Sequence, residues 1–171
     1  YVVFQAAPKK VGCEDSVIIE QLKKLSSEYG VDILLLPIGY ASGHDDRGYL
    51  KKLHNKLPEI TTYYDDLNVW EIMFLISKSK CYYGTSLHGA ITAMSFNIPH
   101  FGINKNVVKL DSYLNEWSVA PFNQCYPASE ISALYGTISS DSLVGLQSKN
   151  DLSFKILKSN YIDLVNALKD D

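Results

Sequence analysis

The chain has 171 residues, of which 46% are apolar and 20% are charged. This length is typical of one domain with its own hydrophobic core, and the composition excludes a disordered or fibrous protein. The formal net charge is −3 and the sequence has no basic stripe, which disfavours nucleic-acid binding. No apolar run reaches the ~18 residues that a membrane-spanning helix needs, so we expect no transmembrane segment.

The basic residues are lysines except for one, Arg47. An anion site in this chain must therefore use backbone N–H groups, lysine or histidine rather than several arginine forks. The cysteines, Cys13, Cys81 and Cys125, are far apart and show no zinc-ligand spacing, so we expect reduced thiols and no metal. Reduced thiols indicate a cytoplasmic protein, with peripheral attachment at the inner membrane left open. A start at Tyr1, directly on a strand and without Met, predicts a piece of a longer protein.

Apolar runs of strand type alternate with amphipathic segments in the first part of the chain. Near-continuous apolar runs, typical of parallel strands buried on both faces, occur in five segments: 1–7, 31–38, 60–64, 81–84 and 100–103. Helical spacing of apolar residues predicts four helices between them, at 14–29, 43–57, 68–79 and 87–96. This alternation indicates βαβ units with right-handed crossovers, and therefore a three-layer αβα Rossmann-like parallel sheet.

The pattern is weaker after residue 104. We expect a helix at 107–117, a proline-containing loop at 120–128, and a turn at 139–142 within an ambiguous stretch, 131–146. The chain closes with an amphipathic helix at 152–168, whose apolar residues recur every three or four positions. All of these elements fit one domain over residues 1–171.

Ligands of open parallel sheets bind beyond the carboxyl ends of the strands. At that position the segment Gly84-Thr-Ser-Leu-His-Gly-Ala90 changes from strand to helix within a few residues. Thr85 or Ser86 can cap the helix, which leaves free N–H groups and the positive end of the helix dipole facing the strand ends. Such a turn binds phosphate or carboxylate, and His88 can add a donor or move a proton. The alternative is structural, with a capping serine and a histidine bonded to the backbone.

A second polar segment, 39–47, follows the second predicted strand. It contains His44, Asp45, Asp46 and Arg47 at the expected start of a helix. Acids in a first turn are usually exposed residues that complement the helix dipole. The functional alternative is a cluster that orients a hydroxyl group or contacts a ligand.

The loop after the first predicted strand, 5–12, contains Lys9, Lys10 and Gly12. Phosphate binding is one option for this loop. The patterns GxxxxGK[ST] and GxGxxG are both absent, which excludes a P-loop and disfavours a dinucleotide site.

From Thr85 to Ile103 the sequence resembles the polysaccharide pyruvyl transferase family. That family carries a short strand, a Ser-Arg-Leu-His-Gly or Ser-Leu-His-Gly turn, an Ala-containing helix, and then Pro before a strand. The Gly-His-Asp-Asp piece at 43–46 and the predicted helix 68–79 fit the same layout, so the resemblance covers roughly residues 1–104. It implies that this chain is the C-terminal, Rossmann-like half of a GT-B-like enzyme, with the N-terminal half missing.

The resemblance also implies an activity: transfer of a pyruvyl group from phosphoenolpyruvate to a sugar diol in exopolysaccharide biosynthesis. The acceptor would be a sugar or a lipid-linked oligosaccharide, and no cofactor is implied besides the donor substrate. Thr85, Ser86, Leu87 and Gly89 would bind the donor, and His88 would be the catalytic residue. Contacts with donor or acceptor are expected from the following residues: Gln5, His44, Asp45, Asp46 and Arg47.

Two positions depart from the family pattern. Ser86 stands where many members have Arg, and Gln5 stands near where an Arg often follows the first strand. Two other functions stay open. A GT-B glycosyltransferase that uses a nucleotide-sugar would need a carboxylate to hold the ribose, for which Glu71 is the one candidate. A non-catalytic α/β module such as a receiver domain would need acids after the first strand, where the sequence has Gln5-Ala-Ala7.

Overall fold

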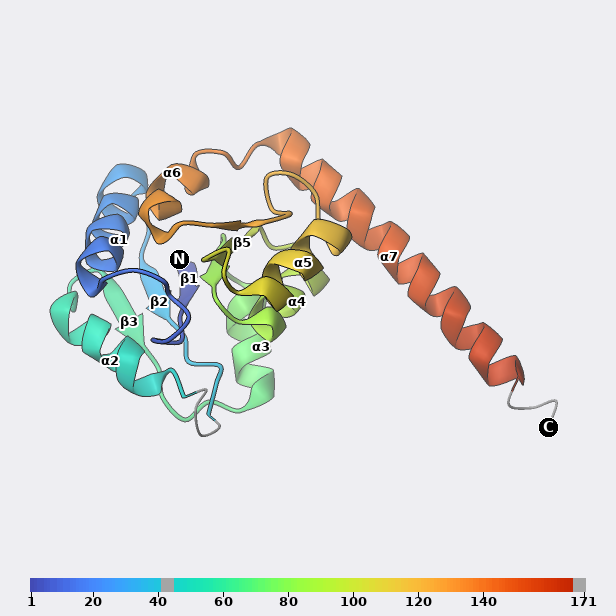
Figure 1. Ribbon diagram of the computed structural model, residues 1–171, viewed down its shortest axis with the longest axis horizontal. Helices are drawn as coiled ribbons and strands as arrows, with labels where there is room; N and C mark the ends of the chain where they lie inside the picture. Colours follow the sequence, from blue (N-terminus) through green and yellow to red (C-terminus); the bar gives the residue numbers. More distant parts are fainter. Residues whose placement is uncertain (41–44, 168–171) are drawn as a thin grey trace.

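A computed structural model describes residues 1–40 and 45–167 as a parallel sheet covered by helices (Figure 1). The strands are β1 (Val2–Gln5), β2 (Ile33–Leu35), β3 (Thr61–Tyr63), β4 (Tyr82–Gly84), β5 (His100–Ile103) and β6 (Cys125–Tyr126). Their order across the sheet is β3-β2-β1-β4-β5-β6, and every neighbouring pair is parallel. The strand order reverses between β1 and β4, so the connections that follow these two strands diverge and leave a ligand crevice at the carboxyl edge.

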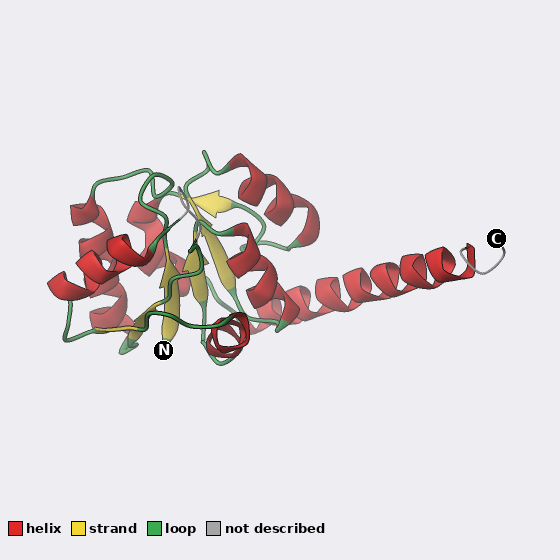
Figure 2. Cartoon of the chain, turned by 90° about the horizontal axis from the view of Figure 1, so that it is seen from below, coloured by secondary structure: helices red, strands yellow, loops and turns green. Residues whose placement is uncertain are grey.

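Helices cover both faces of the sheet and give it three layers (Figure 2). The first layer contains α1 (Asp15–Tyr29), α2 (Arg47–Lys56), the 3-10 turn η1 (Ala128–Glu130) and α6 (Ile131–Tyr135). The second layer contains α3 (Val69–Ser77), α4 (Leu87–Ser95) and α5 (Val108–Trp117). Along β1, Val2 and Phe4 face the first layer and Val3 faces the second, all fully buried, as the period of two in a strand requires. The predicted Rossmann-like fold is confirmed.

The connections after β5 differ from the sequence-based expectation. The segment 120–128, expected to be a loop, contains the short edge strand β6, whose residue Cys125 pairs with Gly102. The turn expected at 139–142 is instead the start of α7 (Ser140–Ala167), which runs for 28 residues. Ser139 precedes this helix, and its hydroxyl accepts a hydrogen bond from the Ser142 N–H at 3.1 Å. The serines at 139–142, which suggest a turn in the sequence, therefore cap the start of a helix.

The last part of α7 extends away from the body of the protein (Figure 1). Its predicted apolar stripe exists, but Phe154, Leu157, Tyr161 and Leu164 are 59–68% exposed instead of packed against the sheet. Although this helix is long, neither it nor any other helix within residues 1–40 and 45–167 has the apolar length to cross a membrane.

His100 on β5 is fully buried and makes the stability of the fold depend on pH. Its Nδ1 bonds the Ile98 carbonyl and its Nε2 bonds the Ser118 hydroxyl, each at 3.0 Å, which satisfies a neutral ring. Burial lowers the pKa of His100 from 6.5 to about 4. Between these two values the unfolded chain binds the additional proton, so stability is complete above pH 6.5 and decreases by up to about 3 kcal/mol as the pH falls to about 4.

Urea denaturation at several pH values between 4 and 7 measures this decrease. The variant His100→Leu separates the effect of this histidine from that of carboxylate titration. The stability of the variant should depend less steeply on pH, by the slope that the uptake of one proton on unfolding contributes. An identical slope in both proteins would contradict the assignment.

Candidate functional site

The strand-to-helix turn after β4 keeps backbone amides free at the carboxyl edge of the sheet. Ser86 is the N-cap of α4, and its hydroxyl accepts a hydrogen bond from the Gly89 N–H at 3.3 Å. The Ala90 N–H bonds the Ser86 carbonyl, which starts the helix. Within the described part of the chain, no acceptor bonds the N–H groups of Leu87 and His88. These two amides, at the positive end of the helix dipole, are available to an anion.

His88 and Gly89 occupy opposite sides of this first helical turn. The His88 side chain is exposed, and no described residue hydrogen-bonds its ring. Gly89 is buried against β4, where a Cβ atom would collide with the Tyr82 hydroxyl. Glycine at this position lets α4 lie directly on the strand, which fixes where the turn and its histidine stand.

The crevice between β1 and β4 holds a cavity of about 520 Å³, which we call the switch-point cavity. Five of the predicted site residues line it: Gln5, Thr85, Ser86, Leu87 and His88. Lys10, Tyr40 and Lys109 also contribute to its wall, and no Asp or Glu of residues 1–40 and 45–167 does so. The charged and polar groups around this cavity therefore favour an anionic ligand.

A buried hydrogen-bond chain ties together the elements around the cavity. The Gln5 side-chain amide donates to the Asp46 carboxylate at 2.6 Å, and its oxygen accepts from the Thr85 N–H at 3.1 Å. Thr85 in turn accepts from the Ala7 N–H at 3.0 Å through its hydroxyl. Because both polar ends of Gln5 are used and the residue is 3% exposed, it positions the turn and does not present a free group to a ligand.

Asp46 is fully buried, in contrast to the exposed acid that a first helical turn predicts. The Ile38 and Gly39 N–H groups donate to its carboxylate at 3.2–3.3 Å, in addition to Gln5. Burial raises the pKa of Asp46 above its ordinary value, although these hydrogen bonds oppose the shift. The carboxylate thus joins the loop after β2 to the end of β1, 41 residues earlier in the chain.

Asp45 and Arg47, two further predicted residues of the second polar segment, do not line the switch-point cavity. Asp45 forms an exposed ion pair with Arg47 at 2.7 Å, and the Arg47 guanidinium lies 5.0 Å from the centre of the Tyr40 ring. Arg47 therefore reaches the cavity only through Tyr40. His44, also expected to contact a ligand, falls in segment 41–44, outside the described residues.

Sequence reasoning considered Lys10 as part of a possible phosphate-binding loop, but it selected neither Tyr40 nor Lys109, which also line the cavity. Lys10 and Tyr40 lie in the loops after β1 and β2. Lys109 lies in the first turn of α5, the helix that follows β5. The rule that ligands bind beyond strand ends covers the loops that hold Lys10 and Tyr40, and it would have reached Lys109 had it included the first turn of the following helix.

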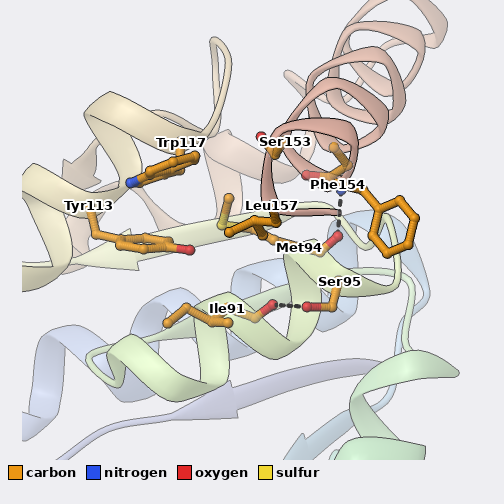
Figure 3. Close-up of a pocket in the computed structure, with 9 residues that line it drawn as sticks. Ile91, Met94, Ser95, Tyr113, Trp117, Ser153, Phe154 and Leu157 are labelled. Carbon is orange, nitrogen blue, oxygen red and sulfur yellow. Dashed lines mark hydrogen bonds between the residues drawn. The ribbon is translucent and has the colours of Figure 1, made fainter. Parts of the chain in front are cut away.

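A larger cavity, of about 640 Å³, lies between α4, α5 and α7, away from this turn (Figure 3). Tyr113 and Trp117 on α5 face Met94 on α4 and Leu157 on α7 across it. The Asn150 side chain bonds the Met94 carbonyl and so attaches α7 to α4. The charged groups of the switch-point cavity are absent from this apolar groove, whose described lining consists of apolar and uncharged polar residues.

The doubly wound parallel sheet, with free amides and lysines at its switch point, defines the chain as a Rossmann-like α/β domain. The sequence model of the polysaccharide pyruvyl transferase family matches residues 5–106, and the chain belongs to this family. The match begins at Gln5, the last residue of β1, and includes β4 and the turn with His88. A comparison with curated proteins found no match.

Solved structures with a similar fold include a heptosyltransferase and a UGT. The E. coli heptosyltransferase WaaC with ADP has 12% identity and a TM-score of 0.57, over 84% of this chain and 46% of that chain. The UGT2 of Phytolacca americana, in complex with UDP-2fluoro-glucose and pterostilbene, has 9% identity and a TM-score of 0.51, over 88% of this chain and 36% of that chain. The chain thus spans less than half the length of either protein, and at these identities the likeness describes the fold.

Proposed function

We propose that this chain is the donor-binding half of an enzyme that transfers a pyruvyl group from phosphoenolpyruvate to a sugar diol. Membership of the pyruvyl transferase family supports the reaction. The observation that carries the proposal is the switch-point cavity, where the free amides of Leu87 and His88 lie with Lys10 and Lys109 and where no described carboxylate contributes to the wall. Phosphoenolpyruvate carries a phosphate and a carboxylate, and it needs such cationic surroundings.

Lys10 and Lys109 supply positive charge where Ser86 and Gln5 replace arginines that are common in the family. Gln5, near the position of a common family arginine, is used within the buried hydrogen-bond chain. Lys10 and Lys109 approach the same cavity from two other elements, the loop after β1 and the start of α5. A lysine ammonium is a compact point charge that attracts phosphate without the fixed fork of arginine.

In the proposed reaction the two hydroxyl oxygens of the diol form bonds to C2 of phosphoenolpyruvate, and the C2–O bond to phosphate breaks. The two hydroxyl groups lose one proton each. The methylene carbon gains one proton, and the other proton leaves with phosphate. His88 donates a hydrogen bond or a proton to the donor, which the exposed position of its ring permits.

The competing function is glycosyl transfer from a nucleotide-sugar. Its expected ribose ligand, Glu71, is engaged in a capping box, where its carboxylate accepts from the Asn68 N–H at 2.8 Å. Glu71 lines a different cavity, beside Trp70 and Phe74. No other carboxylate takes its place in the described wall of the switch-point cavity.

Isothermal titration of the protein with phosphoenolpyruvate, inorganic phosphate, pyrophosphate and uridine diphosphate tests the proposal. We expect saturable binding of phosphoenolpyruvate that phosphate competes with and that weakens at high salt. We expect uridine diphosphate to bind no more tightly than pyrophosphate, because nothing would recognise its nucleoside. Failure to bind phosphoenolpyruvate, together with tight binding of uridine diphosphate, would select the nucleotide-sugar reaction instead.

A further inference from the structure

A second cavity, of about 310 Å³, adjoins the switch-point cavity and shares Lys10, Val107 and Lys109 with it. Lys9 is the charged residue that it adds, and Asn104, Asn106 and Val108 complete its lining. We call it the lysine cavity. Three lysines therefore line a space that adjoins the site of the proposed donor.

Charge is segregated around this space. The whole chain has 19 acidic and 16 basic residues, yet neither cavity has an Asp or Glu in its described lining. The ion pairs of the described residues use other basic groups, so Lys9, Lys10 and Lys109 are unpaired within that part of the chain. Mutually repelling cations that lack protein partners are favoured by an anionic ligand between them.

The backbone that carries the lysines is held in place. The Asn104 side-chain amide donates to the Lys10 carbonyl at 2.9 Å, which joins the loop after β5 to the loop after β1. Asn104 has a left-handed backbone with φ 70°, and its side-chain oxygen accepts from the Asn106 N–H at 3.0 Å. The two loops thus form one frame, with Lys10 on one side and Lys109 on the other.

We propose that the lysine cavity binds a diphosphate ester next to the phosphoenolpyruvate site. The described lining has three lysines and no acidic side chain. It therefore suits a ligand with several negative charges better than a ligand with one. Identification of this ester as the activated end of the sugar acceptor rests on the proposed function. The diphosphate chemistry itself does not, because a nucleotide-sugar carries the same group.

Isothermal titration with pyrophosphate tests the site. Lys9→Gln is the informative variant because Lys9 lines the lysine cavity and does not line the switch-point cavity. We expect this variant to weaken pyrophosphate binding about fivefold, as expected for loss of one charge contact near water. The matched control is Lys80→Gln, an exposed lysine next to the amino end of β4, at the opposite edge of the sheet, which should leave the affinity unchanged. Equal effects of the two variants, or no pyrophosphate binding, would overturn the proposal.

Two diphosphate esters then distinguish the source of the ligand. Tighter binding of geranyl diphosphate than of pyrophosphate would indicate a lipid-linked acceptor, and tighter binding of uridine diphosphate would indicate a nucleotide. Either result, if sensitive to Lys9→Gln, supports the diphosphate site. If pyrophosphate binds in this way while phosphoenolpyruvate does not bind, the proposed function fails and the site stands.

Discussion

Replacement of His88 by alanine should abolish most pyruvyl transfer while leaving the fold intact. The ring is exposed and no described residue hydrogen-bonds it, so its loss removes little that stabilises the protein. A general acid in the transition state contributes about 10²–10⁴-fold to a rate. We therefore expect at least about a 100-fold lower rate of phosphate release from phosphoenolpyruvate, measured with a sugar acceptor and the complete enzyme, and a nearly unchanged Tm.

A second substitution separates the two possible functions of this histidine. Glutamine can donate a hydrogen bond but cannot transfer a proton, so His88→Gln should bind phosphoenolpyruvate better than His88→Ala and remain as slow in transfer. If His88→Gln recovers the rate, His88 acts as a hydrogen-bond donor only. Full transfer by His88→Ala would refute the assignment altogether.

His54 provides the matched control for this series. It lies on α2, away from the switch-point cavity, and its ring bonds the Thr61 hydroxyl at 2.8 Å. His54→Ala should therefore reduce stability by about 1 kcal/mol, the value of one hydrogen bond, without changing the affinity for phosphoenolpyruvate. Replacement of His88 should thus lower activity with little change in stability, and replacement of His54 should lower stability with little change in phosphoenolpyruvate affinity.

Local signals were enough to predict the sheet and the turn, because both depend on neighbouring residues. Alternating apolar runs and helix caps identify β1 to β5, and the strand-helix junction at 84–90 identifies the capped turn. The strand β6 was missed because it has only two residues within a proline-containing segment. So short a strand forms through pairing with β5, and tertiary pairing has no local signature.

Features that depend on distant partners could not be predicted in this way. An acid before a helix suggests exposure, yet Asp46 is buried because Gln5 is brought to it by the sheet. The apolar stripe of α7 correctly predicted an amphipathic helix. It could not show that the side chains of Phe154, Leu157, Tyr161 and Leu164 would stay more than half exposed.

Removal of Gln5 should cost the fold about 3 kcal/mol, far more than a polar residue at an exposed strand end would. Gln5→Leu deprives the buried Asp46 carboxylate of its 2.6 Å donor and the Thr85 N–H of its side-chain acceptor. Hydrogen bonds to charged groups contribute about 1.5–3 kcal/mol, and a buried carboxylate without its donor is costly. The Tm should fall by roughly 6–12 °C, since 1 kcal/mol corresponds to about 2–4 °C in a chain of this size.

A double-mutant cycle with Asp46→Leu assigns the effect to this pair. Each single variant removes one partner of the buried Gln5–Asp46 hydrogen bond and leaves the other partner without it, whereas Gln5→Leu with Asp46→Leu removes both partners. The double variant should therefore be more stable than the summed single losses by about 1–3 kcal/mol. Asp45→Ala is the control, because its ion pair with Arg47 is equally short but exposed, and its loss should cost less than about 1 kcal/mol. Strict additivity in urea denaturation, or equal losses for Gln5→Leu and Asp45→Ala, would show that the buried chain does not hold the site together.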